Sequence, residues 1–146
     1  MQTNGKFTVA IHICTYMHYS GKELVTSQQI ADSVKTNPVV IRRIIAKLRE
    51  AGIIGSIAGA KGGFFLNKPV EQITLWDIYL AVKENDLFYK PKPNPDCAVG
   101  SNLASLVDDS FEAAELSMKG ALSNTNISML NERLEKILNT EDMLSC

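Results

Sequence analysis

Two adjacent arginines, Arg42 and Arg43, are the residues of this 146-residue chain best suited to bind an anion. Arginine presents a planar fork of N–H donors that fits phosphate oxygens and the guanine edge. On a helix that turns about 100° per residue, both arginines and Val39 point away from the side that holds Ile41 and Ile44. The sequence therefore predicts an exposed, basic helix face suited to DNA, with a merely solvated basic face as the plainer interpretation.

The charge distribution supports an anion-binding first half. Residues 1–70 carry nine Lys/Arg and three Asp/Glu (9 − 3 = +6), whereas residues 71–146 carry six and thirteen (6 − 13 = −7). A formal net charge of −1 argues against a bulk polycation, but this asymmetry indicates one basic part that meets an anion. The candidate DNA-contacting residues are Ser27, Gln28, Thr36, Asn37, Pro38, Val39, Arg42, Arg43, Lys47, Lys61 and Gly62, with Lys35 and Arg49 nearby.

The three cysteines, Cys14, Cys97 and Cys146, form no C-x-x-C pair. Their odd number argues against a secreted disulfide scaffold and a four-Cys zinc site, and indicates a reducing cytoplasm. Cys97 precedes a predicted long helix whose first amides would lower the pKa of its thiol. Cys97 and Cys146 are therefore candidate redox sensors; the alternative is a core Cys14, an inert Cys97 and an incidental Cys146.

No pattern predicts an enzyme or a metal site. His12 and His18 are six residues apart, so they point to nearly opposite sides of a helix. Asp108, Glu112 and Glu115 fit a solvated acidic helix face better than a cation site. The sequence has no phosphate-binding loop, dinucleotide fingerprint or G-x-S-x-G motif.

Helices and a hairpin must position the basic residues. The spacing of Phe7, Ala10, Ile11, Cys14 and Met17 predicts a first helix. A capping box at Thr26 opens a second helix, and Asn37-Pro38 opens a third that runs to about Ala51, with Gly52 as a left-handed cap. Two apolar β-type runs, at 53–57 and 64–66, flank the basic, glycine-rich segment AGAKGG. Helices followed by a hairpin are typical of a winged helix-turn-helix.

The second half is expected to be helical and interrupted by one loop. A capping box at Thr74 opens a helix to about Lys83, and a loop with three prolines follows at 88–97. A helix from about Ser101 to Leu122 and a last helix at about 127–138 come next, and the final eight residues look frayed. The long helix carries an apolar stripe that predicts the seam of a helix pair: Leu103, Val107, Phe111, Ala114, Met118 and Leu122.

The segment 36–69, TNPVVIRRIIAKLREAGIIGSIAGAKGGFFLNKP, closely resembles the DNA-contacting helix and wing of the Rrf-type bacterial winged-helix regulators, the IscR, NsrR and CymR group. The pattern L-x-x-x-G-h-h-x-S-x-x-G-x-x-G-G-[FY]-x-L from Leu48 to Leu66 carries the resemblance, which extends from about Gly5 to Val82. It implies a homodimer whose long helices cross and which binds a palindromic operator in double-stranded DNA.

The chain departs from this family in two respects. Cluster-binding relatives place three cysteines in the loop before the long helix, where this chain has Cys97 alone, so no iron–sulfur cluster is expected. Relatives commonly carry an arginine just before the first wing glycine, where this chain has Ala58; Lys61 is the available substitute. Arg42 and Arg43 stand where relatives place other base-contacting residues, which predicts a different operator.

The fold expected is mainly α with a small β-hairpin wing. Residues 1–87 form the winged helix-turn-helix, 88–100 a Pro-rich loop, and 101–146 the dimerisation and C-terminal helices. The function expected is a homodimeric, sequence-specific transcriptional regulator, a repressor that responds to thiol oxidation and uses no metal or other cofactor. The alternatives are a winged-helix adaptor that binds protein and a regulator with a small effector in a cavity beside the long helix. His and Thr residues within 7–21 argue against a signal sequence or membrane span there.

Overall fold

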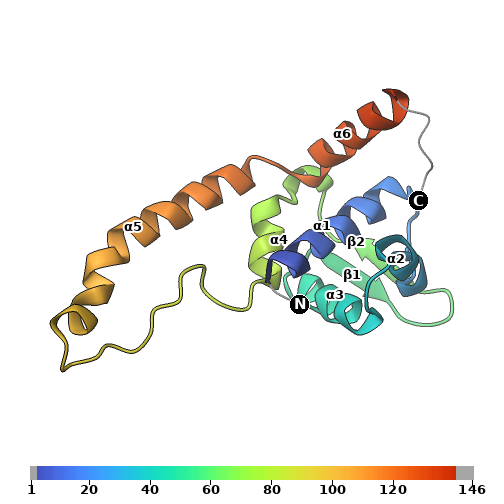
Figure 1. Cartoon of the computed structure of the whole chain (residues 1–146). Helices are drawn as coiled ribbons and strands as arrows, with labels where there is room; N and C mark the ends of the chain where they lie inside the picture. The colour runs from blue at the N-terminus through green and yellow to red at the C-terminus, as the bar shows by residue number, and fades with distance from the viewer. Residues whose placement is uncertain (1–2, 141–146) are drawn as a thin grey trace.

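The computed structural model describes residues 3–140 and has the predicted order of elements (Figure 1). Six helices, one 3₁₀ turn and one hairpin follow each other along these residues. Their bounds are α1 (Thr3–Tyr19), α2 (Ser27–Val34), α3 (Pro38–Glu50), β1 (Ile54–Ile57), β2 (Gly63–Leu66), η1 (Val70–Gln72), α4 (Leu75–Val82), α5 (Ala98–Ser123) and α6 (Ile127–Thr140). Among residues 3–140, no helix combines the length and the apolar character needed to cross a membrane.

Helix α1 is the centre of the folded body. It contacts α2, α3, α4, α6 and β2, so apolar residues are needed around most of its circumference. Ala10, Cys14 and Met17 are buried as predicted. Ile11, which we expected on the same inward face, is only half-buried, and Ile13 is fully buried instead. A single stripe could not be assigned correctly because neighbours surround this helix on several sides.

Local hydrogen bonds fix the helix-turn-helix. The Thr26 hydroxyl accepts the Gln29 N–H, and the Gln29 side chain accepts the Thr26 N–H, which confirms the predicted capping box. The Asn37 side chain accepts the Val39 N–H at 2.9 Å, so α3 begins at Pro38 as predicted. Gly52 has a φ of +76°, the left-handed conformation expected after the end of α3.

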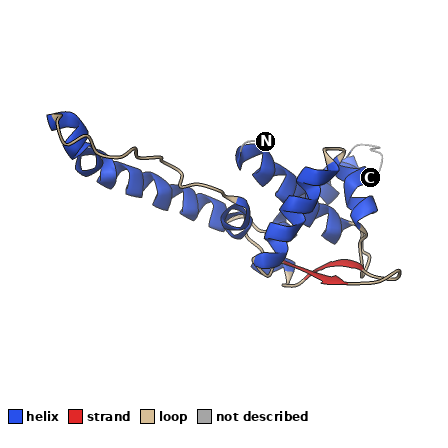
Figure 2. Ribbon diagram, turned by 90° about the horizontal axis from the view of Figure 1, so that it is seen from below, coloured by secondary structure: helices blue, strands red, loops and turns tan. Residues whose placement is uncertain are grey.

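The hairpin packs against the helical body through both strands, β1 against α3 and β2 against α1. Strands β1 and β2 pair antiparallel, with Ile54 opposite Leu66 and Ile57 opposite Gly63. On its other side, β2 exchanges two backbone hydrogen bonds between Phe64 and Val25. The hairpin therefore has a fixed base and an exposed tip at one edge of the body, as the red strands in Figure 2 show.

Helix α4 begins at a side-chain cap. Thr74 and Asp77 form a reciprocal capping box, in which the Thr74 hydroxyl accepts the Asp77 N–H and the Asp77 carboxylate accepts the Thr74 N–H, both at 3.1 Å. We expect Thr74→Ala to lower the free energy of unfolding by about 1 kcal/mol, because one amide at the start of α4 loses its acceptor. Urea denaturation will measure it, with Thr74→Ser as the matched control; equal stability of the alanine and parent proteins would contradict the cap's importance.

Helix α5 extends away from the body and is the least covered element (Figure 1). None of its 26 residues, all within the described part of the chain, is buried. It begins at Ala98, three residues before the predicted Ser101, because the Cys97 thiol caps it by accepting the Gly100 N–H. Residues 98–100, assigned above to the Pro-rich loop, are therefore helical, and α6 extends two residues beyond its predicted end.

The stripe on α5 that we expected to pair with another helix is partly covered by the chain itself. The Phe88 ring stacks on Phe111 with centroids 4.3 Å apart. Residues 89–94 of the Pro-rich loop line a cavity of about 320 Å³ together with Leu103, Val107 and Phe111. Toward its end, α5 contacts α4. The loop thus covers part of this stripe within one chain, and the role of the stripe as the seam of a helix pair stays a prediction.

Candidate nucleic-acid interface

The outward face of α3 is the first part of the candidate interface. Ile41, Ile44 and Leu48 are at most 2% exposed, which fixes the rotation of the helix about its axis. Arg42 and Arg43 are exposed as predicted, and Val39 is 44% exposed on the same face. A helix with buried isoleucines on one side and two free arginines on the other can enter a major groove without losing core contacts.

The wing adds a groove beside the start of α2. This groove, about 360 Å³, lies between Thr26 and Ser27 of the capped helix start and the wing residues 56–60, with Arg49 of α3 at its edge. Lys61 is exposed at the tip. Hydroxyl groups and a guanidinium around one groove are groups that commonly hold a DNA phosphate. Figure 1 shows α3 and the hairpin along the same lower side of the body.

Among the predicted residues, Lys47 lies apart from the wing groove. Lys47 and Arg43 line a separate hollow of about 280 Å³ with Lys6, Glu50 and Glu84. Lys6 forms an ion pair with Glu84, which holds the pKa of that carboxyl below its ordinary value. Lys47 is half-buried there, so the structure separates it from the wing groove.

The smaller predicted residues lie at or just before the starts of α2 and α3. Ser27, Asn37 and Pro38 are exposed, whereas Thr36 is half-buried. The Gln28 amide donates to the Asp32 carboxylate at 2.8 Å, so its side chain lies along α2.

Two residues at this interface escaped the sequence argument. Arg49 was treated as a neighbouring cation, but it borders the wing groove. Ile57 is 54% exposed on β1 and was counted as part of an apolar strand. Its position at the solvent end of a short strand was the available signal, since an exposed apolar side chain beside cations can contact a thymine methyl group.

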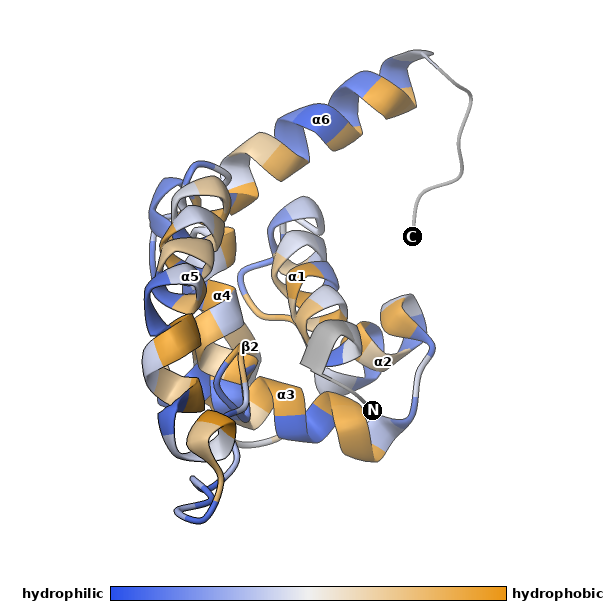
Figure 3. Cartoon of the chain, turned by 60° about the vertical axis from the view of Figure 1, so that its left-hand side comes forward, coloured by the Kyte–Doolittle hydropathy of each residue, from blue (hydrophilic) through white to orange (hydrophobic). Residues whose placement is uncertain are grey.

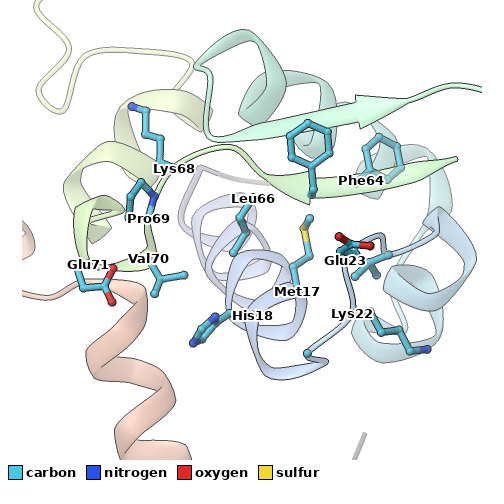
Figure 4. Close-up of a pocket in the computed structure, with 13 residues that line it drawn as sticks. Met17, His18, Lys22, Glu23, Phe64, Leu66, Lys68, Pro69, Val70 and Glu71 are labelled. Atoms are coloured by element: carbon cyan, nitrogen blue, oxygen red, sulfur yellow. The ribbon is translucent and has the colours of Figure 1, made fainter.

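The largest cavity described lies behind the wing, on a different side from the arginines of α3. It has a volume of about 570 Å³ and opens between the end of α1, strand β2 and η1. Figure 4 shows Met17 of α1 and Leu66 of β2 near the middle of the lining, with the charged side chains of Lys22, Lys68 and Glu71 farther out. Its rim carries both signs of charge, including Lys22 and Glu71, so it offers no uniform anion site.

The two cysteines of the described chain have opposite environments. Complete burial in α1 raises the pKa of Cys14 to about 12. Cys97 is exposed at the start of α5, where the N–H groups of Gly100 and then Val99 lower the pKa of its thiol. Cys146, the other candidate sensor, lies outside the described residues. Cys97 therefore has more thiolate at neutral pH than an ordinary cysteine.

We expect Cys97 to react with iodoacetamide much faster than Cys14 in the folded protein at pH 7–8. The reason is that the thiolate is the nucleophile, and the two pKa shifts act in opposite directions. The alkylation rate of Cys97 should rise with pH and reach half of its maximum below the ordinary thiol pKa of 9.0. Mass spectrometry of quenched samples will measure both sites, and equal rates at the two cysteines would contradict this assignment.

Both histidines lie on α1 and are half-buried. His12 is half-buried and shares a hydrogen bond of 2.9 Å with the Ser33 hydroxyl, and desolvation lowers its pKa. His18, also half-buried, lines the cavity behind the wing.

Comparison with known proteins gives a consistent result. The family model of Rrf2, described as an iron-dependent transcriptional regulator, matches residues 3–133. YwnA of Bacillus subtilis, classed with the HTH-type transcriptional regulators, is 39% identical over 126 residues, which cover 85% of this chain and 92% of YwnA. The T. potens IscR structure superimposes with a TM-score of 0.64 at 18% identity, covering 97% of this chain and 90% of that one. The oxidized form of Staphylococcus aureus CymR gives a TM-score of 0.61 at 22% identity, covering 90% and 97%.

The iron in that family description can be tested against the donors present. Within residues 3–140, no three His, Cys, Asp or Glu side chains gather as metal ligands would. Cys14 is enclosed in the core, and Cys97 is exposed at the start of α5. The described residues thus offer two cysteine thiols at separate helical elements, whereas an iron–sulfur cluster is usually held by four cysteines.

Proposed function

Because the chain belongs to the Rrf2 family of transcriptional regulators, we propose that it is a homodimer that binds a palindromic operator in double-stranded DNA. We further propose that it represses transcription in the cytoplasm, catalyses no reaction, and works without an iron–sulfur cluster. The observation that carries the proposal is the outward face of α3, where Val39, Arg42 and Arg43 are exposed above a row of buried isoleucines.

Each half of the interface has a distinct task in this proposal. Arg42 and Arg43 contact base edges or phosphates in the major groove, since the first turns of such a helix reach the bases. Ser27, Arg49 and Lys61 hold the backbone on either side of the wing groove. Every cation that neutralises a phosphate adds to the salt dependence of binding, so operator affinity is expected to fall steeply as salt rises.

The proposed signal is oxidation of Cys97. A peroxide would convert its thiolate to a sulfenic acid, with the peroxide O–O bond broken and hydroxide or alcohol released. Condensation with a second thiol, for which Cys146 is the candidate, would release water and form a disulfide. The lowered thiol pKa of Cys97 supports this role, as does the existence of an oxidized form of CymR, which shares the fold.

Selection of bound genomic DNA fragments tests the proposal. Purified protein is incubated with the fragments at one fixed salt concentration, first reduced and then oxidised with peroxide. We expect a palindromic motif that is enriched in only one of the two states. Equal enrichment in both states would remove the thiol response but keep the regulator. No enriched motif, together with a tight protein complex in a pull-down, would replace the regulator by a protein-binding adaptor.

A further inference from the structure

Lys35 has a backbone conformation that lysine rarely adopts. Its φ is 52° and its ψ is 45°, which is the left-handed region. Within residues 3–140, the other residues with a positive φ are glycines: Gly21, Gly52 and Gly59. In this region the Cβ atom of an L-residue lies too close to the following carbonyl oxygen, whereas glycine has no Cβ. The backbone of this turn therefore suits glycine, and a lysine there lowers the stability of the fold.

Hydrogen bonds on both sides of Lys35 hold the turn in place. The Lys35 N–H donates to the Ala31 carbonyl oxygen at 2.9 Å and closes the end of α2. Two residues later, the Asn37 side chain caps the start of α3. Residues 35–37 are the whole link between the two helices, and Figure 3 shows this link as a hydrophilic segment at the edge of the body. A left-handed residue at the end of α2 lets the chain turn within so short a link.

No contact within residues 3–140 accounts for the lysine side chain at this position. Lys35 is exposed and forms no ion pair with another residue of that range. Asp32, three residues earlier, is the nearest carboxylate in the sequence, but it accepts the Gln28 amide at 2.8 Å. The packing and hydrogen bonds of the fold therefore give no reason for a lysine where the backbone favours glycine.

The sequence around Lys35 is cationic throughout. Residues 33–49 contain no Asp or Glu and carry five cations: Lys35, Arg42, Arg43, Lys47 and Arg49. Like charges in one segment repel each other, so the charge of Lys35 adds to the cost of its backbone unless an anion is bound nearby. When such a helix enters a major groove, its first turns lie beside the phosphates that border the groove. A DNA phosphate is therefore an anion that this charge fits.

We propose that Lys35 binds a DNA phosphate at the start of α3, and that its left-handed conformation is a cost in stability retained for this contact. The inference rests on the proposed DNA-binding function and adds a backbone contact to it. Ser27 and Arg49 lie at the wing groove, whereas Lys35 lies in the link before α3. Strained residues persist where the surrounding structure enforces their conformation, and they cluster at positions that bind ligands.

Substitution of Lys35 by glycine tests both parts of the inference. We expect Lys35→Gly to raise the folding equilibrium constant about threefold, because glycine adopts the left-handed conformation without a Cβ clash. The variant should bind operator and unrelated DNA roughly three- to tenfold more weakly at about 0.1 M salt. The slope of log affinity against log salt should become shallower by about one, since one phosphate contact is lost. Urea denaturation and fluorescence anisotropy will measure stability and affinity.

Two further substitutions at the same position separate the charge from the backbone. Lys35→Arg keeps both the positive charge and the Cβ atom, so its stability, DNA affinity and salt slope should match those of the parent. Lys35→Asn removes the charge but supplies a residue that tolerates the left-handed region. It should therefore bind DNA as weakly as Lys35→Gly, with a stability at or above that of the parent.

Lys22→Gly is the matched control, because it removes one exposed lysine from another link between two helices. Lys22 has no positive φ, and it lines the cavity behind the wing, on a different side from the arginines of α3. This variant should bind operator with the affinity and salt slope of the parent. Its stability should not rise, since glycine relieves no Cβ clash at position 22.

The outcomes distinguish this inference from the proposed function. A Lys35→Gly protein with the affinity and salt slope of the parent would overturn the phosphate contact and leave the proposed function standing. A Lys35→Gly protein no more stable than the parent would overturn the cost assigned to the left-handed lysine. Weaker binding to the operator alone, with unrelated DNA unaffected, would indicate a base contact and overturn the phosphate contact. A parent protein that enriches no DNA motif would refute the proposed function and this inference together.

Discussion

Replacing Arg42 or Arg43 with alanine is expected to weaken operator binding by about 1–3 kcal/mol each, a loss of roughly five- to 150-fold. Both side chains are exposed on the outward face of α3, while the buried isoleucines on the other side hold the helix in place. Neither substitution removes a core contact, so the free energy of unfolding should change by less than about 0.5 kcal/mol. Fluorescence anisotropy with a labelled operator will measure the affinities.

The form of the loss will distinguish two roles for each arginine. An arginine that contacts a guanine should, when removed, weaken binding to the operator more than to unrelated DNA. An arginine that contacts a phosphate should weaken both equally and reduce the salt slope by about one. Arg133→Ala, which removes an exposed cation on α6, is the control and should leave operator affinity unchanged. Parent-like binding by both α3 variants would contradict the placement of α3 on DNA.

The sequence predicted the helix-turn-helix well because the signals for its helix ends are local. At Thr26 and Asn37, the side chain accepts a hydrogen bond from a backbone N–H that is only two or three residues farther along the chain. The positive φ of Gly52 follows from its place after a helix end. Rotation of α3 follows from four apolar residues on one side of a helix that has solvent on the other. In each case, neighbours in sequence determine the geometry.

The sequence did not show the contacts that join distant segments. The stripe on α5 through Phe111 was predicted as the seam of a helix pair, without the loop that covers part of it. The structure places Phe88 on Phe111 because the loop returns along the helix, which no spacing rule within α5 could show. Arg49 likewise borders a groove that is formed by two distant segments, the start of α2 and the wing.

The wing should be the most easily damaged part of the interface. A Cβ atom at Gly62 would lie 1.9 Å from the Ile57 carbonyl oxygen and within 2.9 Å of two further backbone carbons. Backbone atoms of the facing strand cannot rotate away as a side chain can, so Gly62→Ala must open the hairpin tip. The tip also depends on a hydrogen bond of 3.0 Å from the Gly62 N–H to the Gly59 carbonyl, which the same opening would break.

We therefore expect Gly62→Ala to weaken operator binding by about 1–2 kcal/mol, roughly five- to thirtyfold, through displacement of Lys61 and the wing groove. The helical core should keep its far-ultraviolet circular dichroism, because Ile54 and Phe64 still hold the base of the hairpin. Ala60→Ser is the matched control, since Ala60 is exposed at the same tip and a hydroxyl adds no clash there. If Gly62→Ala bound operator as tightly as Ala60→Ser, the wing would have no share in the interface, and α3 alone would have to account for the affinity.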